Sequence, residues 1–179
     1  MLVLVGPSAS GKSAVVKNLV SNHNMVKFVT CTTRPPRVGE INGVDYYFMS
    51  EKEFNDRFAN DEFIETVYYN GNYYGTLKSE VSDNKVVILE PQGLQNFLRA
   101  VPDIYAVVLK TDEQKLKDRM LYRGDSVLEM EKRIANDRIL FSAEQLKDAS
   151  LVVDTSNYSI SQISDIIYSN YSLYCENNK

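Results

Sequence analysis

A glycine-bounded loop near the N-terminus carries a lysine and a serine at the spacing of a phosphate-binding loop. It follows the apolar run Leu2–Val5 and reads Gly6-Pro7-Ser8-Ala9-Ser10-Gly11-Lys12-Ser13, which matches G-x-x-x-x-G-K-[ST] between a strand and a helix. The glycines let backbone N–H groups converge on phosphate oxygens, and the helix N-terminus adds partial positive charge. Lys12 supplies a full charge for terminal phosphates, and Ser13 supplies a hydroxyl for Mg²⁺. We expect this loop to bind a nucleoside triphosphate.

Two arginines further along the chain have the chemistry of a second phosphate site. Arg34 and Arg37 lie in the segment Thr32-Thr33-Arg34-Pro35-Pro36-Arg37, whose prolines forbid a helix and hold the backbone extended. Planar guanidinium groups on rigid backbone match the oxygens of a dianionic phosphate. Surface salt bridges are the alternative role for these two arginines. The pattern favours a dianionic phosphate group as the second ligand.

Short apolar runs predict the strands that must position these loops. Val, Ile and Leu dominate them without alternation, which is typical of strands buried on both faces of a parallel sheet. These strands are expected at 2–5, 86–89, 106–109 and 151–153, with a further strand at 25–31. Helical spacing or composition predicts helices from 14 to about 20, at 51–60 and at 93–100. It also predicts a pair of helices within 112–148, interrupted at 123–126. A closing helix is expected through 160–167, and the last residues of the chain, 176–179, are expected to fray.

The order of these elements predicts an α/β fold. A phosphate-binding-loop (P-loop) mononucleotide-binding parallel sheet is flanked by helices. Glycines punctuate tyrosine-rich stretches between residues 39 and 76, which indicates a small β-rich insertion.

Composition excludes several classes of protein. The 179 residues include 20 basic and 24 acidic side chains, so a net charge of -4 gives no global positive field for nucleic acid. No apolar run approaches the length of a membrane span. Cys31 and Cys175 are expected to be free thiols, and His23 a solvated loop residue. Because Met1 leads directly into the first strand, we expect a cytoplasmic protein without a signal peptide.

Five blocks of sequence, in order, resemble the successive motifs of guanylate kinases. They are the P-loop, the Thr32–Arg37 segment, Gly39-Glu40-Ile41-Asn42-Gly43-Val44-Asp45-Tyr46 with Asp61-Glu62-Phe63-Ile64-Glu65, Gly71-Asn72-Tyr73-Tyr74-Gly75-Thr76, and the arginine-rich segment 119–138. The resemblance covers nearly the whole chain. It implies an enzyme that transfers the γ-phosphoryl group of ATP, with Mg²⁺, to GMP and dGMP, giving ADP with GDP or dGDP.

The resemblance also implies roles for individual residues. Glu65 matches the glutamate that accepts hydrogen bonds from guanine N1–H and N2–H₂, donors that adenine lacks. The set of acceptor-binding residues it implies is Thr30, Arg34, Arg37, Tyr46, Glu65, Tyr74, Thr76 and Glu90. The set of catalytic residues it implies is Lys12, Arg34, Arg119, Arg123 and Arg133. The last three belong to a mobile lid, and because Arg119 and Arg123 are four apart we expect them on one helix face.

A single domain, 1–179, is expected to contain three parts. The core covers about 1–33, 80–115 and 145–179, the acceptor-binding insertion about 34–79, and the helical lid about 116–144. Each of the following residues also has an alternative role. Tyr46 and Tyr74 could pack a small sheet, and Thr30 and Thr76 could be ordinary strand residues. Glu65 and the lid arginines could be charges on a solvated surface.

The chain departs from the family pattern at two strand ends. Where relatives show D-x-D-x-Q-G, this chain has Ile88-Leu89-Glu90-Pro91-Gln92-Gly93, so Glu90 can replace the second aspartate but Ile88 cannot replace the first. Asp154-Thr155-Ser156-Asn157 also differs from the Asn-Asp that relatives favour near the adenine. These changes concern base choice, metal geometry and rate, and leave phosphate handling intact.

Two other functions fit parts of the pattern. One is a related P-loop kinase with another acceptor, such as a different deoxynucleotide or a ribose bisphosphate. The other is a non-catalytic guanylate-kinase-like module that binds phosphorylated peptides, although such modules typically lack the Lys12 and Ser13 equivalents. The expected partners are the nucleotides ATP and GMP or dGMP, without nucleic acid or membrane, and the chain is a monomer or a homodimer.

Overall fold

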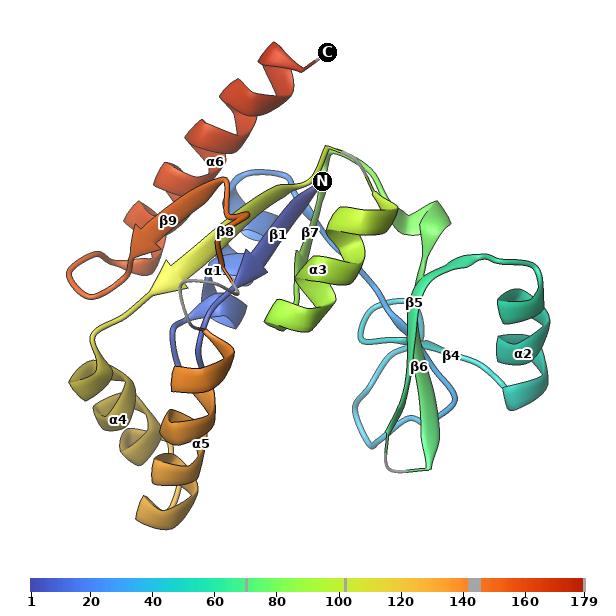
Figure 1. Cartoon of the computed structure of the whole chain (residues 1–179), viewed down its shortest axis with the longest axis horizontal. Helices are drawn as coiled ribbons and strands as arrows, with labels where there is room; N and C mark the ends of the chain where they lie inside the picture. The colour runs from blue at the N-terminus through green and yellow to red at the C-terminus, as the bar shows by residue number, and fades with distance from the viewer. Residues whose placement is uncertain (70, 102, 142–145, 179) are drawn as a thin grey trace.

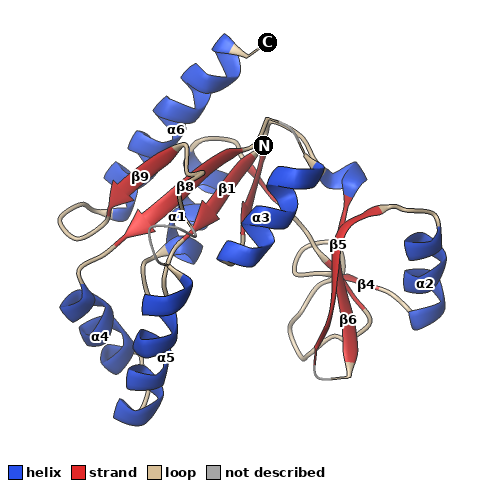
Figure 2. Ribbon diagram, in the orientation of Figure 1, coloured by secondary structure: helices blue, strands red, loops and turns tan. Residues whose placement is uncertain are grey.

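A five-stranded parallel sheet forms the centre of the computed structural model, which describes residues 1–69, 71–101, 103–141 and 146–178 (Figures 1 and 2). The strand order is β2-β7-β1-β8-β9, and every neighbouring pair in it is parallel. The strands are β1 (Leu2–Val5), β2 (Val26–Lys27), β7 (Lys85–Ile88), β8 (Tyr105–Lys110) and β9 (Leu151–Asp154). The α/β fold expected from the sequence is confirmed.

Helices cover both faces of this sheet, which explains why its inner strands are almost wholly apolar. Along β1 the side chains alternate: Leu2 and Leu4 pack with α1 (Lys12–Asn22) and α6 (Ile160–Asn177), whereas Val3 and Val5 pack with α3 (Pro91–Ala100). All four are fully buried. At about 1.5–3 kcal/mol for each buried side chain, this double-sided burial fixes the end of β1, from which the P-loop departs.

A second, four-stranded sheet lies apart from the first (Figure 1). Its order is β4-β3-β6-β5, with β4 (Tyr47–Phe48), β3 (Cys31–Thr32), β6 (Asn72–Leu77) and β5 (Phe63–Tyr69). The helix α2 (Glu51–Ala59) packs on it through Phe54, and a short 3₁₀ helix, η1 (Lys78–Glu80), leads back to the core. The small β-rich insertion with one helix is therefore present as expected.

Two helices, α4 (Glu113–Tyr122) and α5 (Val127–Leu140), form a pair beside the P-loop. Leu116, Met120, Met130 and Ile134 pack together between them. Ser126 and Glu129 form a reciprocal capping box that begins α5, and Arg138 donates to both oxygens of Glu113 at 2.7 and 2.8 Å. The predicted interruption at 123–126 is confirmed. Residues 142–144 of the expected lid, and residue 145 of the expected core, lie outside the described residues.

The single strand expected at 25–31 is wrong. The chain instead forms β2 in the parallel sheet and β3 in the second sheet. Between them Phe28 and Val29 are buried, so an apolar run of strand-like composition here crosses from one sheet to the other. Local composition could not distinguish a crossing from a continuous strand, because both bury apolar side chains.

Other expectations need smaller corrections. His23 is not a solvated loop residue, since its ring stacks on Tyr168 at 4.5 Å and its Nε2 lies 3.0 Å from Asp165 Oδ1. The closing helix remains helical to Asn177 instead of fraying from residue 176. Ile88, at the end of β7, is 36% exposed. Both cysteines are free as expected, and burial raises the pKa of the Cys31 thiol to about 12.

None of the helices within the described ranges has the length and apolar character needed to cross a bilayer.

Close packing at Gly75 gives a stability prediction. A Cβ at this position would lie 2.7 Å from Phe63 Cδ1 and 3.0 Å from Phe54 Cζ, and these two rings already stack on each other. We expect Gly75→Ala to lower the free energy of unfolding by about 1–3 kcal/mol, as overpacking does. Urea denaturation measures it. Gly93→Ala is the control, because its Cβ would make ordinary contacts at 3.5 Å or more. A wild-type urea midpoint for Gly75→Ala would contradict the packing.

The ion pair between α4 and α5 predicts a pH-dependent stability. Hydrogen bonds from Arg138 and then Lys117 lower the pKa of Glu113 from 4.5 to about 2. Because the folded-state pKa is below the unfolded value, the stabilisation is complete above pH 4.5 and is lost as the pH falls toward 2. Glu113→Gln should therefore lower Tm slightly at pH 7, and the difference from wild type should shrink below pH 4.5.

The matched control for this pH series is Glu131→Gln, since Glu131 is exposed on α5 and has no ion pair within the described part of the chain. Thermal unfolding followed by circular dichroism between pH 7 and 3 makes the comparison. A Tm difference for Glu113→Gln that is unchanged at pH 3 would show that this ion pair does not contribute.

Candidate active site

The P-loop turns sharply between β1 and α1. Ala9 and Gly11 both have positive φ, 61° and 99°, and the Ser10 N–H donates to Pro7 O at 3.2 Å. Gly6 packs directly on β8, where a Cβ would lie 2.8 Å from the Leu109 carbonyl oxygen. The loop therefore has little freedom. It holds the N-terminus of α1 at the carboxyl edge of the parallel sheet, where α/β proteins commonly bind ligands.

Lys12 folds back across this loop. Its Nζ donates to Gly6 O at 2.5 Å and to Pro7 O at 2.8 Å. Burial lowers the pKa of Lys12, and the negative charges of Glu90 and Asp137 oppose that shift. Ser13 follows on the first turn of α1 and is exposed. The arrangement places an ammonium group and a free hydroxyl beside a helix N-terminus, which suits the phosphates of a nucleotide.

Both helices of the α4–α5 pair contact the P-loop. Arg119 of α4 donates from Nη1 to Ala9 O at 3.1 Å. Asp137 of α5, which is buried, accepts the backbone N–H of Ser8 at 2.8 Å. Ala9 also packs against the apolar cluster between the two helices. Of the predicted lid arginines, Arg119 is therefore at the loop.

Arg123 and Arg133 lie instead around one carboxylate at the turn between α4 and α5. Arg123 Nη2 is 2.5 Å from Asp125 Oδ2, and Arg133 Nη1 is 3.7 Å from the same oxygen. The hydrogen bond from Arg123 lowers the pKa of Asp125. Arg123 is the C-cap of α4, and its backbone N–H donates to Arg119 O at 3.3 Å, one helical turn earlier. Asp125 thus holds two of the predicted catalytic arginines together, away from the loop backbone.

Arg34 occupies an aromatic and acidic corner of the second sheet. Its Nη2 lies 2.8 and 3.0 Å from the two oxygens of Glu40, and its guanidinium carbon lies 5.5 Å from the ring centroid of Tyr46. The rings of Tyr46 and Tyr74 are 6.2 Å apart, and Tyr74 helps Glu40, the larger cause, to raise the pKa of Arg34. Three residues predicted to bind the acceptor phosphate are therefore neighbours.

Glu40 organises this corner as well as pairing with Arg34. It also accepts the backbone N–H of Arg37 at 2.6 Å, while the Arg37 side chain is exposed. The Arg34 hydrogen bond, followed by that of Arg37, lowers the pKa of Glu40. By contacting the Arg34 guanidinium and the Arg37 backbone, the Glu40 carboxylate holds the proline-containing segment in place.

Glu65 and Thr76 face each other across neighbouring strands. The register of β5 and β6 pairs the two residues directly, and Thr76 is 3% exposed. The side-chain amide of Asn96 on α3 donates to Glu65 Oε2 at 3.0 Å. A Cβ on Gly93, also in α3, would lie 3.6 Å from Glu65 Oε1. The predicted guanine-recognising carboxylate is thus fixed between a strand pair and a helix.

Thr30 lies just before β3 of the second sheet, and Glu90 follows β7 of the parallel sheet. Thr30 is partly buried just before β3, and its carbonyl accepts the Tyr47 N–H at 2.8 Å. Glu90 is exposed at the N-cap of α3, and its charge acts on Lys12. The helix α3 therefore has one end near Lys12 and its middle on Glu65.

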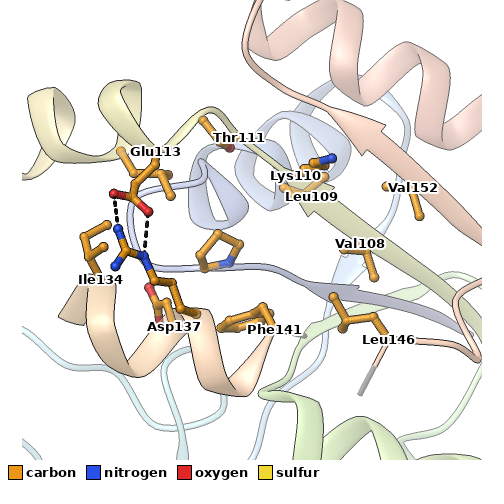
Figure 3. A pocket seen from close by; sticks show the side chains of 13 residues that line it. Val108, Leu109, Lys110, Thr111, Glu113, Ile134, Asp137, Phe141, Leu146 and Val152 are labelled. Atoms are coloured by element: carbon orange, nitrogen blue, oxygen red, sulfur yellow. Dashed lines mark hydrogen bonds and ion pairs between the residues drawn. The ribbon is translucent and has the colours of Figure 1, made fainter. Parts of the chain in front are cut away.

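Two cavities adjoin the P-loop on different sides. One, of about 600 Å³, is lined by Ser13, Ile88 and Tyr47 together with apolar residues of α1. The other, of about 520 Å³, lies between β8, β9 and α5, and Figure 3 shows Glu113 among the residues that line it. Arg138, which pairs with Glu113, also lines this cavity. Of the residues predicted to bind nucleotide, Pro7 alone lines this second cavity. Ile88 borders the same space as Ser13.

Sequence reasoning missed four polar residues of this site: Glu40, Asn96, Asp125 and Asp137. Glu40 follows Arg37 by three residues in a turn, so local spacing offered a signal. Asp125 follows Arg123 by two and offered a similar one. The other two act across 31 and 129 residues, respectively, and local spacing does not reveal such contacts.

Comparisons with known proteins agree with this geometry. A family model described as guanylate kinase matches residues 1–170. A guanylate kinase of Enterococcus faecalis is 35% identical over 181 aligned positions, covering 96% of this chain and 89% of the relative. A guanylate kinase of Clostridium perfringens is 38% identical over 138 positions, covering 72% of this chain but only 63% of the relative.

A solved structure supports the fold. The crystal structure of guanylate kinase from Anaplasma phagocytophilum superposes with a TM-score of 0.61 at 24% identity, covering 97% of this chain and 84% of that one. The family model spans the P-loop, the insertion and both helices beside the loop. The chain therefore belongs to the guanylate kinase family.

Proposed function

We propose that this protein transfers the γ-phosphoryl group of ATP to GMP, and to dGMP, giving ADP and GDP or dGDP. The observation that carries the proposal is the position of α3. Leu89, just before its N-cap residue Glu90, donates its backbone N–H to Leu4 O near the end of β1 at 3.0 Å. Asn96 in the middle of the helix donates to Glu65. One helix thus links the donor-phosphate loop to a carboxylate suited to guanine.

The parts of the domain take separate roles in this proposal. The core, about 1–33, 80–115 and 145–179, binds ATP through Gly6–Ser13. The insertion, about 34–79, binds GMP through Arg34, Arg37, Tyr46 and Tyr74 at the phosphate and through Thr30, Glu65 and Thr76 at the base. The lid, about 116–144, brings Arg119, Arg123 and Arg133 to the donor phosphates.

The transfer needs positioning and charge more than covalent participation of the protein. An oxygen of the GMP phosphate forms a bond to the γ-phosphorus of ATP, and the bond from that phosphorus to the β–γ bridging oxygen breaks. Because the attacking oxygen is already anionic, no general base is required. Lys12 exchanges its two carbonyl partners for phosphate oxygens, and Arg34 exchanges Glu40 for the acceptor phosphate.

Magnesium fits the donor side of the site on chemical grounds. Among the described residues no three His, Cys, Asp or Glu side chains group closely enough to hold a metal ion. The exposed hydroxyl of Ser13 and the phosphate oxygens would form a hard oxygen set, in which Mg²⁺ usually depends on substrate phosphates and water. Bound there, Mg²⁺ would neutralise charge on the β- and γ-phosphates.

An assay of ADP release tests the acceptor directly. Purified protein with ATP·Mg²⁺ is compared on GMP, dGMP, AMP, CMP, UMP and dTMP. We expect the highest kcat/KM with GMP or dGMP, since their N1–H and N2–H₂ groups pair with Glu65. Higher kcat/KM with any other base would refute the proposed specificity. ATP hydrolysis that GMP did not raise would refute the proposed transfer.

Two substitutions separate transfer from base selection. Lys12→Ala should reduce kcat by roughly 10²–10³-fold with every acceptor, because a fixed charge on the transferring phosphoryl group is lost. Glu65→Gln should reduce the kcat/KM ratio of GMP over AMP by about 10-fold or more, because an oxygen acceptor facing guanine is replaced by a donor. Steady-state kinetics measures both.

Lys17→Ala is the control for these variants, since Lys17 is exposed on α1 one turn after Ser13. It should keep wild-type kinetics. Equal loss on all acceptors for Glu65→Gln would remove Glu65 from base recognition, and transfer by Lys12→Ala at the wild-type rate would remove the P-loop from the reaction.

A further inference from the structure

Asn96 makes a polar contact that the P-loop, the acceptor arginines and the lid do not explain. It lies in the middle of α3, and its Nδ2 donates to Glu65 Oε2 at 3.0 Å across the contact between α3 and β5. Its own Oδ1 faces Gln92 Nε2 at 3.4 Å, one helical turn earlier. Both Asn96 and Glu65 are partly buried.

This contact is not what attaches α3 to the protein. Leu94 and Phe97, on either side of Asn96 in sequence, are fully buried in the core and supply the apolar packing of the helix. Burying such side chains contributes far more to stability than one partly exposed hydrogen bond. Leu94 and Phe97 therefore account for the packing of α3. The hydrogen bond from the Asn96 amide to Glu65 is better explained by the chemistry of the carboxylate.

The Glu65 carboxylate has acceptor positions besides the one that Asn96 uses. An ionised glutamate offers two oxygens with about four acceptor positions, and its terminal torsion is broad when nothing fixes it. The Asn96 N–H uses one position on Oε2. This contact fixes the plane of the carboxylate. Oε1 and the second position on Oε2 stay available for two adjacent donors.

We propose that Asn96 is a positioning residue that orients the Glu65 carboxylate for two adjacent donors of guanine, and thereby sets base selectivity. This inference rests on the proposed function, because it concerns how the acceptor base is chosen. Guanine presents N1–H and N2–H₂ side by side, so both carboxylate oxygens must lie in the plane of the base. A freely rotating carboxylate would distinguish poorly between GMP and IMP, which lacks the 2-amino group.

The test compares GMP with IMP in wild type, Asn96→Ala and Asn96→Asp. We expect Asn96→Ala to raise KM for GMP about 10-fold with little change in KM for IMP, and to keep kcat within about twofold, because the lost hydrogen bond acts on ground-state base recognition. Asn96→Asp places a second carboxyl group beside Glu65, so KM for GMP should rise on the acid side at a higher pH than in wild type.

Gln95→Ala is the matched control, because Gln95 neighbours Asn96 on α3 but contacts Asp148. It should keep the wild-type ratio of KM for IMP over GMP. A wild-type ratio in Asn96→Ala, or an equal loss with both nucleotides, would overturn the role of Asn96 while the proposed function stood. Absence of GMP phosphorylation by the wild type would instead overturn the proposed function, and this inference with it.

Discussion

Under the proposed function, a chain of net charge -4 has to bind polyanionic nucleotides, so positive charge has to be concentrated locally and held in place. In the structure, most of the lysine and arginine side chains that the proposal assigns to a phosphate contact an oxygen atom of the protein. Lys12 lies against two loop carbonyls, Arg119 against the Ala9 carbonyl, Arg34 against Glu40, and Arg123 with Arg133 around Asp125. The proposed nucleotide binding would then be an exchange of partners by cations that are already in place, which avoids much of the cost of ordering long side chains.

The scaffold makes that exchange geometrically possible. The buried parallel sheet fixes the P-loop at the carboxyl end of β1, and the glycine at its start allows close packing on β8. The second sheet fixes Glu65 opposite Thr76 and gathers Arg34 with two tyrosines. The helix α3 connects the two regions, since the charge of its N-cap residue Glu90 acts on Lys12 and the side-chain amide of Asn96 donates to Glu65. The P-loop and the second sheet, which are proposed to bind ATP and GMP respectively, are thus connected through a helix packed on the core.

Features carried by short-range patterns could be predicted from the sequence. The P-loop, the parallel strands and the β-rich insertion each have local signatures, and the motif order indicated the family. The crossing between β2 and β3 could not be predicted, because its apolar residues look like one strand. The contacts of Asn96 and Asp137 could not be predicted either, since both depend on tertiary placement of distant elements. The different partners of Arg119 and Arg123, which are the Ala9 carbonyl and Asp125, could not be predicted from their four-residue spacing.

The most direct test of this account is a crystal structure of the protein with GMP and a non-hydrolysable ATP analogue bound together with Mg²⁺. The account predicts that the Arg34 guanidinium leaves Glu40 for the GMP phosphate, that Lys12 contacts the donor phosphates, and that guanine N1 and N2 each lie about 3 Å from Glu65 oxygens. GMP bound with its base away from Glu65, or with Arg34 still paired to Glu40 and out of reach of the phosphate, would contradict it.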